Sequence, residues 1–445
     1  MNTALVLGAG LVARPLVRYL LEQPDFRVTV ASRTVSKAEA LIGGHPRGAA
    51  LPLLADETAR LEQLVREHDL AISLLPAPLH PVVAELCIRH GKHMVTTSYV
   101  SPQMRQLDAP AREAGIMLLN EVGVDPGIDH MSAMRIIDDV RRRGGRVISF
   151  KSYCGGLPAP EANDNPWGYK FSWSPRAVCT AGKNAARFRE SGKLVEIPGP
   201  ELFTCTHPLP VEGIGELEAY PNRDSLIYID AYGLQDIETM FRGTLRYPGW
   251  SACMKKVVDL GLLDETPTVY PDGMTFAQFT ARLINATSTA DLRRQVAAHL
   301  GLDEASNVLD RLEWLGLFSD EPLPITGRET TPLDILATRM GEKMPYRPGE
   351  RDMIVLVHQF VARFPDGPDE RISSTLIEFG QPDGDSAMAR TVSLPAAVGA
   401  KLILTGQLRE VGVHIPVKPE IYNPILDELT RLGIHCREQT ERVAG

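Results

Sequence analysis

The sequence predicts a doubly wound α/β domain followed by a less regular second region. Short apolar runs alternate with amphipathic stretches in the first third of the chain, and a glycine-rich turn follows the first apolar run. Beyond Val147 the pattern changes to segments punctuated by Gly and Pro. Because 445 residues with 44% hydrophobic content are too many for one core, we expect two or three domains.

The first domain is predicted from strand candidates separated by helices that carry one charged face, such as 57–67. This alternation is typical of a parallel sheet covered by helices on both faces. The strands are expected at 4–7, 27–30, 70–74, 93–95 and 116–119.

The remainder of the chain predicts a mixture of elements. Apolar residues at helical spacing indicate helices at 276–284, 291–300 and 304–315. Apolar and polar residues alternate on either side of Pro365-Asp366-Gly367-Pro368, which indicates a hairpin. Its strands are expected at 352–364 and 370–379, and two helices at 396–411 and 419–432.

Composition excludes several functional classes. The 47 basic and 56 acidic residues give a net charge of −9, which argues against a nucleic-acid partner. The six cysteines lack CxxC spacing and are expected to be free thiols in a reducing compartment. The apolar run 4–7 follows Met1 so closely that we expect no presequence, and no apolar stretch approaches the roughly 20 residues of a membrane span. We therefore expect a soluble, cytoplasmic protein without membrane contact.

The turn Gly8-Ala9-Gly10-Leu11-Val12-Ala13 joins the first predicted strand to a helix. Gly10 would allow a pyrophosphate to approach the backbone at the helix N-terminus, and the small Ala13 would allow close packing of helix and strand. Glycine-rich turns also occur for packing reasons alone. In a βαβ context, however, this turn predicts a dinucleotide site that includes Gly8, Gly10, Leu11 and Val12.

The end of the second predicted strand indicates which dinucleotide is bound. An NAD site would offer a carboxylate there, whereas this chain has Ser32, Arg33 and Thr34. A hydroxyl and a guanidinium suit a 2′-phosphate, which a carboxylate would repel. The alternative is that Arg33 is a solvated loop residue without a role. The sequence favours NADP(H).

Later strands end in polar segments that should meet at the same crevice. The segment Thr96-Thr97-Ser98-Tyr99-Val100 follows one strand, and Asn120 to His130 follows the next. Taken singly, Asp125 before Pro126 would be a turn former and Tyr99 a packing residue. Together they offer a carboxylate and a phenol that could position or pass protons.

The histidines do not indicate a metal site. His80, His90, His93 and His130 lack a spacing such as HExxH that would direct them to one ion. We predict no metal.

Four further segments carry a resemblance to a known family. They are Tyr153 to Glu161, Asn165 to Ser174, Pro221-Asn222-Arg223-Asp224-Ser225, and Arg242-Gly243-Thr244-Leu245-Arg246-Tyr247. With the glycine-rich turn, they closely resemble saccharopine reductases, the glutamate-forming saccharopine dehydrogenases. The resemblance covers essentially the whole chain and is most specific from Thr96 to Gly249.

The resemblance implies a domain organisation that periodicity cannot supply. It implies a Rossmann-type doubly wound NADP-binding domain at 1–124, completed by 389–445. It also implies a mixed-sheet α+β domain for substrate binding and dimerisation at 125–252, completed by 348–388, and a helical insertion at 253–347. A homodimer that associates through the substrate-domain sheet is expected on the same ground.

The resemblance also implies roles for particular residues. Tyr99, Asp125 and Cys154 would border the reacting amine and carbon, although a free Cys is more often a buried small hydrophobe. The cofactor path would include Leu75, Ser98, Val124 and Trp173, with Asp56 as a looser match. The substrate would contact Ser98, Tyr99, Asp125, Arg223, Leu245, Arg246 and Tyr247. Without the resemblance, Arg223 beside Asp224 would be a surface ion pair of little consequence.

The expected activity is therefore reduction of an imine with NADPH, which joins L-glutamate to 2-aminoadipate 6-semialdehyde as saccharopine, or the reverse oxidation. One alternative is a related imine reductase or dehydrogenase with a carboxynorspermidine-like substrate, which would need fewer carboxylate-binding groups. Another is a non-catalytic NADP-binding sensor, which has no use for Tyr99, Asp125, Arg223 and Arg246 together.

Overall fold

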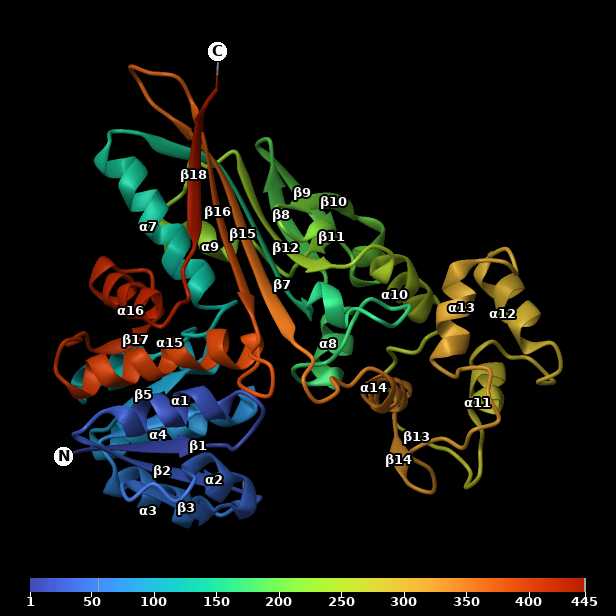
Figure 1. Cartoon of the computed structure of the whole chain (residues 1–445), viewed down its shortest axis with the longest axis horizontal. Coiled ribbons are helices and arrows are strands. Elements are labelled where there is room, and N and C mark those ends of the chain that lie inside the picture. The colour runs from blue at the N-terminus through green and yellow to red at the C-terminus, as the bar shows by residue number, and fades with distance from the viewer. Residues whose placement is uncertain (55, 444–445) are drawn as a thin grey trace. The chain divides into compact units, whose positions relative to one another are not determined.

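The computed structural model describes residues 1–54 and 56–443 (Figure 1). Its contacts divide the chain into two compact units. The first consists of Met1–Val147 and Leu356–Gly445, and the second of Ile148–Val355. The chain therefore leaves the first unit once and returns to it. The three-domain boundaries given above stay a prediction.

The first unit contains a seven-stranded parallel sheet in the order β17-β6-β5-β4-β1-β2-β3. Its strands are β1 (Asn2–Leu7), β2 (Phe26–Ser32), β3 (Gly48–Pro52), β4 (Leu70–Ser73), β5 (His93–Thr96), β6 (Met117–Leu119) and β17 (Gly412–His414). The chain order reverses beside β1, as in other doubly wound folds. The predicted Rossmann-type domain is confirmed, and β3 and β17 are strands that the sequence did not predict.

Helices cover this sheet with apolar faces. Under one face Leu5 and Leu7 of β1 share a core with Val83 and Leu86, and all four side chains are at most 3% exposed. The helices of the unit are α1 (Ala13–Glu22), α2 (Val35–Ile42), α3 (Thr58–Glu67), α4 (His80–His90), α5 (Pro102–Gln106), α6 (Asp108–Glu113), α7 (Ile128–Arg142), α15 (Ala387–Leu404) and α16 (Pro419–Arg431), with a 3-10 turn at Ala77–Leu79. Helix α15 packs against α1, and α16 packs against α7.

Helix α15 differs from its prediction at both ends. We expected a helix at 396–411, but it begins at Ala387, where the Ser386 hydroxyl accepts a hydrogen bond from Ala389 N at 3.0 Å. Pro395 lies inside the helix. By length and composition alone, α15 is apolar enough to cross a membrane, with mean hydropathy 1.3, although Arg390 and Lys401 interrupt its apolar residues. Because 78% of it is buried within the fold, it matches a core helix equally well.

The second unit contains a mixed sheet, as predicted. Strand β7 (Arg146–Pro158), which enters from the first unit, pairs in parallel with β12 (Thr239–Arg246). Strands β10 (His207–Val211) and β11 (Gly215–Pro221) continue the sheet antiparallel to β12, and β8 (Ala186–Glu190) and β9 (Lys193–Ile197) form a hairpin beside it. A Cβ on Gly155 would lie 2.7 Å from Leu245 O, so glycine permits the close approach of β7 and β12.

Helices α8 (Pro175–Ala181), α9 (Ile227–Tyr232) and α10 (Trp250–Asp259) accompany this sheet, with 3-10 turns at Pro160–Ala162 and Gly199–Thr204. The three predicted insertion helices are observed as α11 (Phe276–Leu283), α12 (Leu292–Leu300) and α13 (Asn307–Trp314). A fourth helix, α14 (Pro332–Lys343), and the two-stranded pair β13 (Thr268–Val269) with β14 (Glu329–Thr330) were not predicted.

The chain returns to the first unit along β15 (Asp352–Arg363). The next strand, β16 (Glu370–Phe379), neighbours β15, as the predicted hairpin requires. The terminal strand β18 (Arg437–Arg442) then pairs antiparallel with β16.

Candidate cofactor and substrate site

The glycine-rich turn forms a cradle between β1 and α1. Gly8 has φ 110°, and a Cβ there would lie 3.1 Å from Leu74 O, so only glycine fits the close approach of β1 and β4. A Cβ on Gly10 would meet no atom within 4 Å, which leaves its backbone accessible. No side chain caps α1 at Val12, and Leu11 is 73% exposed. This open helix N-terminus fits a pyrophosphate.

The end of β2 offers a cation and no carboxylate. Ser32 Oγ accepts a hydrogen bond from Thr34 N at 3.3 Å, and both Arg33 and Thr34 are exposed. Within residues 1–54 and 56–443, Arg33 makes no hydrogen bond or ion pair. An uncommitted guanidinium here fits the 2′-phosphate of NADP. Asp56 lies exposed in the turn before α3, where its carbonyl accepts a hydrogen bond from Thr58 N.

The other predicted cofactor residues of the first unit follow strands β4, β5 and β6. Leu75 packs at the edge of the core beneath the sheet, Ser98 is half-buried, and Val124 is 6% exposed. They lie beyond the carboxyl ends of the strands, where doubly wound folds bind ligands. Trp173 belongs to the second unit, where its Nε1 donates to Tyr169 Oη at 3.3 Å.

Two of the predicted proton-handling residues are in contact. The Tyr99 hydroxyl donates a hydrogen bond to Asp125 Oδ1 at 3.0 Å, and both side chains are half-buried. The rule that carboxyl ends of neighbouring parallel strands share one crevice therefore located this pair correctly. Their catalytic roles stay predictions.

Glu121, which the sequence analysis did not single out, braces the backbone on both sides of Tyr99. Its N–H donates to Ser98 O at 3.2 Å, and its Oε1 accepts from Val100 N at 2.9 Å. Its Oε2 lies 2.8 Å from Nε2 of the fully buried His130. Glu121 itself adopts φ 58°, a conformation that costs a non-glycine residue energy and is often found at functional sites.

Cys154 and Arg246 lie on neighbouring strands of the second unit. Cys154 of β7 is paired with Thr244 of β12, two positions before Arg246. The Cys154 side chain is partly exposed, whereas Cys87, Cys179 and Cys253 are buried. Cys154 is therefore not one of the buried cysteines.

Among the described residues Arg246 is a buried cation that forms no ion pair, although Glu218 of β11 lies opposite it in the sheet. It is 6% exposed, its Nη1 donates to Leu245 O at 2.7 Å, and it lies over the rings of Tyr169 at 4.8 Å and Trp250 at 5.5 Å. Its Nε has no hydrogen-bond partner in the described part of the chain. Since burying an unpaired charge is costly, this guanidinium is suited to a carboxylate brought by a ligand.

The residues on either side of Arg246 are held firmly. Leu245 is fully buried, and the Tyr247 hydroxyl donates to Pro158 O at 3.1 Å. Burial, followed by the charge of Glu161, raises the pKa of Tyr247 to about 12. Tyr247 therefore keeps its proton at neutral pH and remains a donor.

Arg223 lies exposed between β11 and α9, with φ 54°. Its carbonyl accepts a hydrogen bond from Arg187 N at 3.0 Å. The neighbouring Asp224 pairs with Arg187 at 3.0 Å, and Asp224 Oδ1 accepts from Leu226 N. Asp224 is therefore engaged by Arg187, and the binding role of Arg223 stays a prediction.

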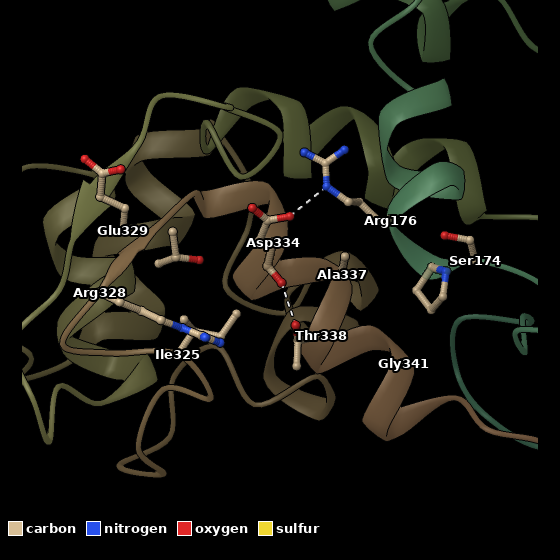
Figure 2. Close-up of a pocket in the computed structure, with 11 residues that line it drawn as sticks. Ser174, Arg176, Ile325, Arg328, Glu329, Asp334, Ala337, Thr338 and Gly341 are labelled. Atoms are coloured by element: carbon tan, nitrogen blue, oxygen red, sulfur yellow. Dashed lines mark hydrogen bonds and ion pairs between the residues drawn. The ribbon is translucent and has the colours of Figure 1, made fainter. Parts of the chain in front are cut away.

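A pocket of the second unit contains none of the predicted site residues. It has a volume of about 530 Å³, and its lining includes Ser174 and residues of α8 and α14 (Figure 2). Arg176 at its edge is paired with Asp334 at 2.7 Å. In the described residues no group of three or more His, Cys, Asp or Glu side chains could hold a metal ion.

Comparison with known families extends over nearly the whole chain. Residues 4–119 match the saccharopine dehydrogenase NADP binding domain, and residues 123–434 match the saccharopine dehydrogenase C-terminal domain. The chain belongs to the saccharopine dehydrogenase family. The resemblance drawn from the sequence motifs is confirmed, and so is an NADP-binding domain.

Similar proteins in this family include saccharopine dehydrogenase [NADP(+), L-glutamate-forming] of Schizosaccharomyces pombe, which is 43% identical over 99% of both chains. The solved apo structure of saccharopine dehydrogenase (L-Glu forming) from Saccharomyces cerevisiae has a TM-score of 0.89 at 38% identity and covers 100% of both chains. The mitochondrial alpha-aminoadipic semialdehyde synthase of Bos taurus is 39% identical over 98% of this chain, which spans 47% of that protein.

Proposed function

We propose that this chain is an NADP-dependent oxidoreductase that interconverts saccharopine with L-glutamate and 2-aminoadipate 6-semialdehyde. The observation that carries the proposal is the 43% identity, over 99% of both chains, with a relative named for this activity. The open glycine cradle, the uncommitted Arg33 and the buried Arg246 support it. Oxidation and reduction share one transition state, so the proposal covers both directions.

In the reductive direction, the amine of glutamate condenses with the aldehyde and releases water, which gives an imine. NADPH, when bound, supplies the hydride that reduces the imine carbon, and the nitrogen takes up a proton to become the secondary amine of saccharopine. The residues of this chain bind and orient the reactants. Gly8, Gly10, Ser32 and Arg33 would hold the dinucleotide.

We assign the remaining roles by chemistry. Arg223 and Arg246 would each hold a substrate carboxylate, since a guanidinium matches a carboxylate with two parallel hydrogen bonds. The Tyr99–Asp125 pair would accept or return the proton at the substrate nitrogen, and Cys154 would border the reacting carbon. Ser98, Leu245 and Tyr247 would complete the substrate contacts.

The two alternatives are less favoured. A carboxynorspermidine-like substrate would need fewer groups that bind carboxylates, and a non-catalytic sensor would not need a hydrogen-bonded phenol and carboxylate. Absorbance of NADPH should rise when saccharopine and NADP⁺ are mixed with the protein, and fall with glutamate plus the semialdehyde. An active protein that ignores both substrate sets would contradict the proposal and favour another imine. NADPH binding without turnover of any imine would favour the sensor.

Replacement of Ser32 by Asp should weaken NADPH binding by about tenfold or more, or ~1.4 kcal/mol. The new carboxylate would repel the 2′-phosphate, and the hydroxyl is lost. The measurement is the Kd from fluorescence titration with NADPH and with NADH. Ser306→Asp is the matched control, because Ser306 caps α13 and Asp serves equally well at that position. Preference of the unaltered protein for NADH would contradict the assignment.

We also infer that the protein is a cytoplasmic homodimer. β15 is mostly buried within the chain, whereas β16 alternates buried and partly exposed residues, so its second face is free to be covered by a partner. Six free cysteines suit a reducing compartment. Sedimentation at micromolar concentration is expected to give twice the mass of one 48.8 kDa chain. A species near the mass of one chain would contradict the dimer, and recovery of the protein with membranes or organelles would contradict the location.

A further inference from the structure

His80 is the first residue of α4 and is buried between the ends of β4 and β5, with 3% of its side chain exposed. Its Nδ1 lies 2.8 Å from Ser73 Oγ. Its Nε2 lies 2.8 Å from Ser98 Oγ and 3.3 Å from Thr96 Oγ1. Burial lowers the pKa of His80 to about 4, so the ring is neutral near pH 7 and carries one proton.

The hydroxyl protons around His80 decide which nitrogen carries that proton. Thr96 Oγ1 donates its single proton to Ser73 O at 2.9 Å, so towards His80 it can only accept. On this basis we assign the proton to Nε2, so that Nδ1 accepts from the hydroxyl of Ser73.

Ser98 is the residue on which this arrangement acts. Its oxygen accepts from Nε2–H of His80, which leaves its own proton for another partner. Within residues 1–54 and 56–443 no acceptor for that proton occurs. The half-buried hydroxyl is thus fixed as a donor beyond the carboxyl end of β5.

We propose that His80 is a positioning residue that fixes Ser98 as a hydrogen-bond donor to a carbonyl or carboxylate oxygen of a bound ligand. Two ligands offer such an oxygen: the carboxamide of the nicotinamide ring, and a carboxylate of saccharopine. The second source rests on the proposed function. A histidine that served only to pack α4 against the sheet would not need its Nε2 proton directed at Ser98.

The test is a double-mutant cycle of His80→Ala and Ser98→Ala in the full chain. Kd for NADPH is measured by fluorescence titration without substrate, and KM and kcat are measured with saccharopine. Both single variants should raise the same constant, either the Kd for NADPH or the KM for saccharopine. The expected rise is roughly tenfold, which corresponds to one hydrogen bond, and kcat should change less. The double variant should be no worse than Ser98→Ala. A raised Kd assigns the acceptor to the cofactor, and a raised KM assigns it to the substrate.

Two polar replacements separate positioning from packing. His80→Gln can keep an N–H near the place of Nε2 and should restore most of the affected constant, whereas His80→Asn reaches only Ser73 and should not. If His80→Ala fails to fold, His80→Asn takes its place in the cycle. His90→Ala, at the end of the same helix, removes a hydrogen bond with Glu62 and should leave all three constants unchanged.

Additive effects in the double variant, unchanged constants in Ser98→Ala, or equal losses in His80→Gln and His80→Asn would each overturn the inference. Failure of the proposed function gives a different result. If the unaltered protein does not turn over saccharopine, the proposed function falls. The Kd for NADPH then decides: a non-additive rise supports the role of His80, and an unchanged Kd in Ser98→Ala overturns it.

Discussion

Replacement of Arg223 by alanine is expected to lower kcat/KM for saccharopine by about 30- to 1000-fold, or ~2–4 kcal/mol of transition-state stabilisation. The reason is the loss of charged hydrogen bonds to a substrate carboxylate. The Kd for NADPH should stay nearly unchanged, because Arg223 is assigned to the substrate alone. Steady-state kinetics and a fluorescence titration measure the two effects separately.

Arg187→Ala is the matched control for Arg223. Arg187 lies beside Arg223, forms the ion pair with Asp224, and has a side chain that is 47% exposed. Since exposed ion pairs contribute little, its removal should change kcat/KM by less than about fivefold. Equal kinetics of Arg223→Ala and the unaltered protein would show that the carboxylate is held elsewhere, with Arg246 as the remaining candidate.

Tyr99→Phe, Asp125→Ala and Cys154→Ala should each lower kcat by roughly one to two orders of magnitude, the lower range for general acid–base contributions. None is expected to be essential, because the substrate amine can itself accept a proton. Since Tyr99 donates to Asp125, the double variant of these two should lose less than the product of the single losses. Rates and pH–rate profiles measure these effects.

Tyr19→Phe is the control for loss of a phenol, because the Tyr19 hydroxyl bonds Glu428 between α1 and α16. It should leave kcat unchanged. Complete loss of turnover in one site variant, with saccharopine and NADP binding retained, would instead identify an obligate catalyst. Unchanged rates and pH profiles in all three would mean that these residues only line the crevice.

The strands of the first unit were predictable where they are apolar and buried. Strands β1 and β4 contain the apolar runs 4–7 and 70–72, and the observed elements contain the predicted ones almost completely. Strand β3 is Gly-Ala-Ala-Leu-Pro, with no fully buried residue, and β17 has only three residues. Such segments become strands because they pair with the edge of a sheet that already exists. Their own pattern of residues therefore does not predict a strand.

The start of α15 was misplaced because proline normally begins or breaks a helix. Here Pro395 is tolerated in the interior of a helix that tertiary packing buries on most sides. The better signal was Ser386, a favoured N-cap residue that follows the polar segment 381–385.

The candidate site was predictable as far as strand order determines it. Tyr99 and Asp125 could be placed together because both follow neighbouring strands. The roles of His80 and Glu121 could not, because each depends on hydrogen bonds between loops whose conformations a single sequence does not specify. Even so, the sequence places His80 at the start of a helix that follows the strand ending in Ser73, and this placement could have indicated their contact.

The return of the chain to its first unit has a consequence during synthesis. Strand β17 adds to β6 at one edge of the parallel sheet, and α15 covers α1, yet both are made after the entire second unit. A nascent chain that ends before Ser386 thus lacks the helix that packs against α1, although β2 and α2 already contact α1. We expect ribosome-bound chains of that length to recruit chaperones and to be cleaved readily by protease within residues 1–147, until the last helices emerge.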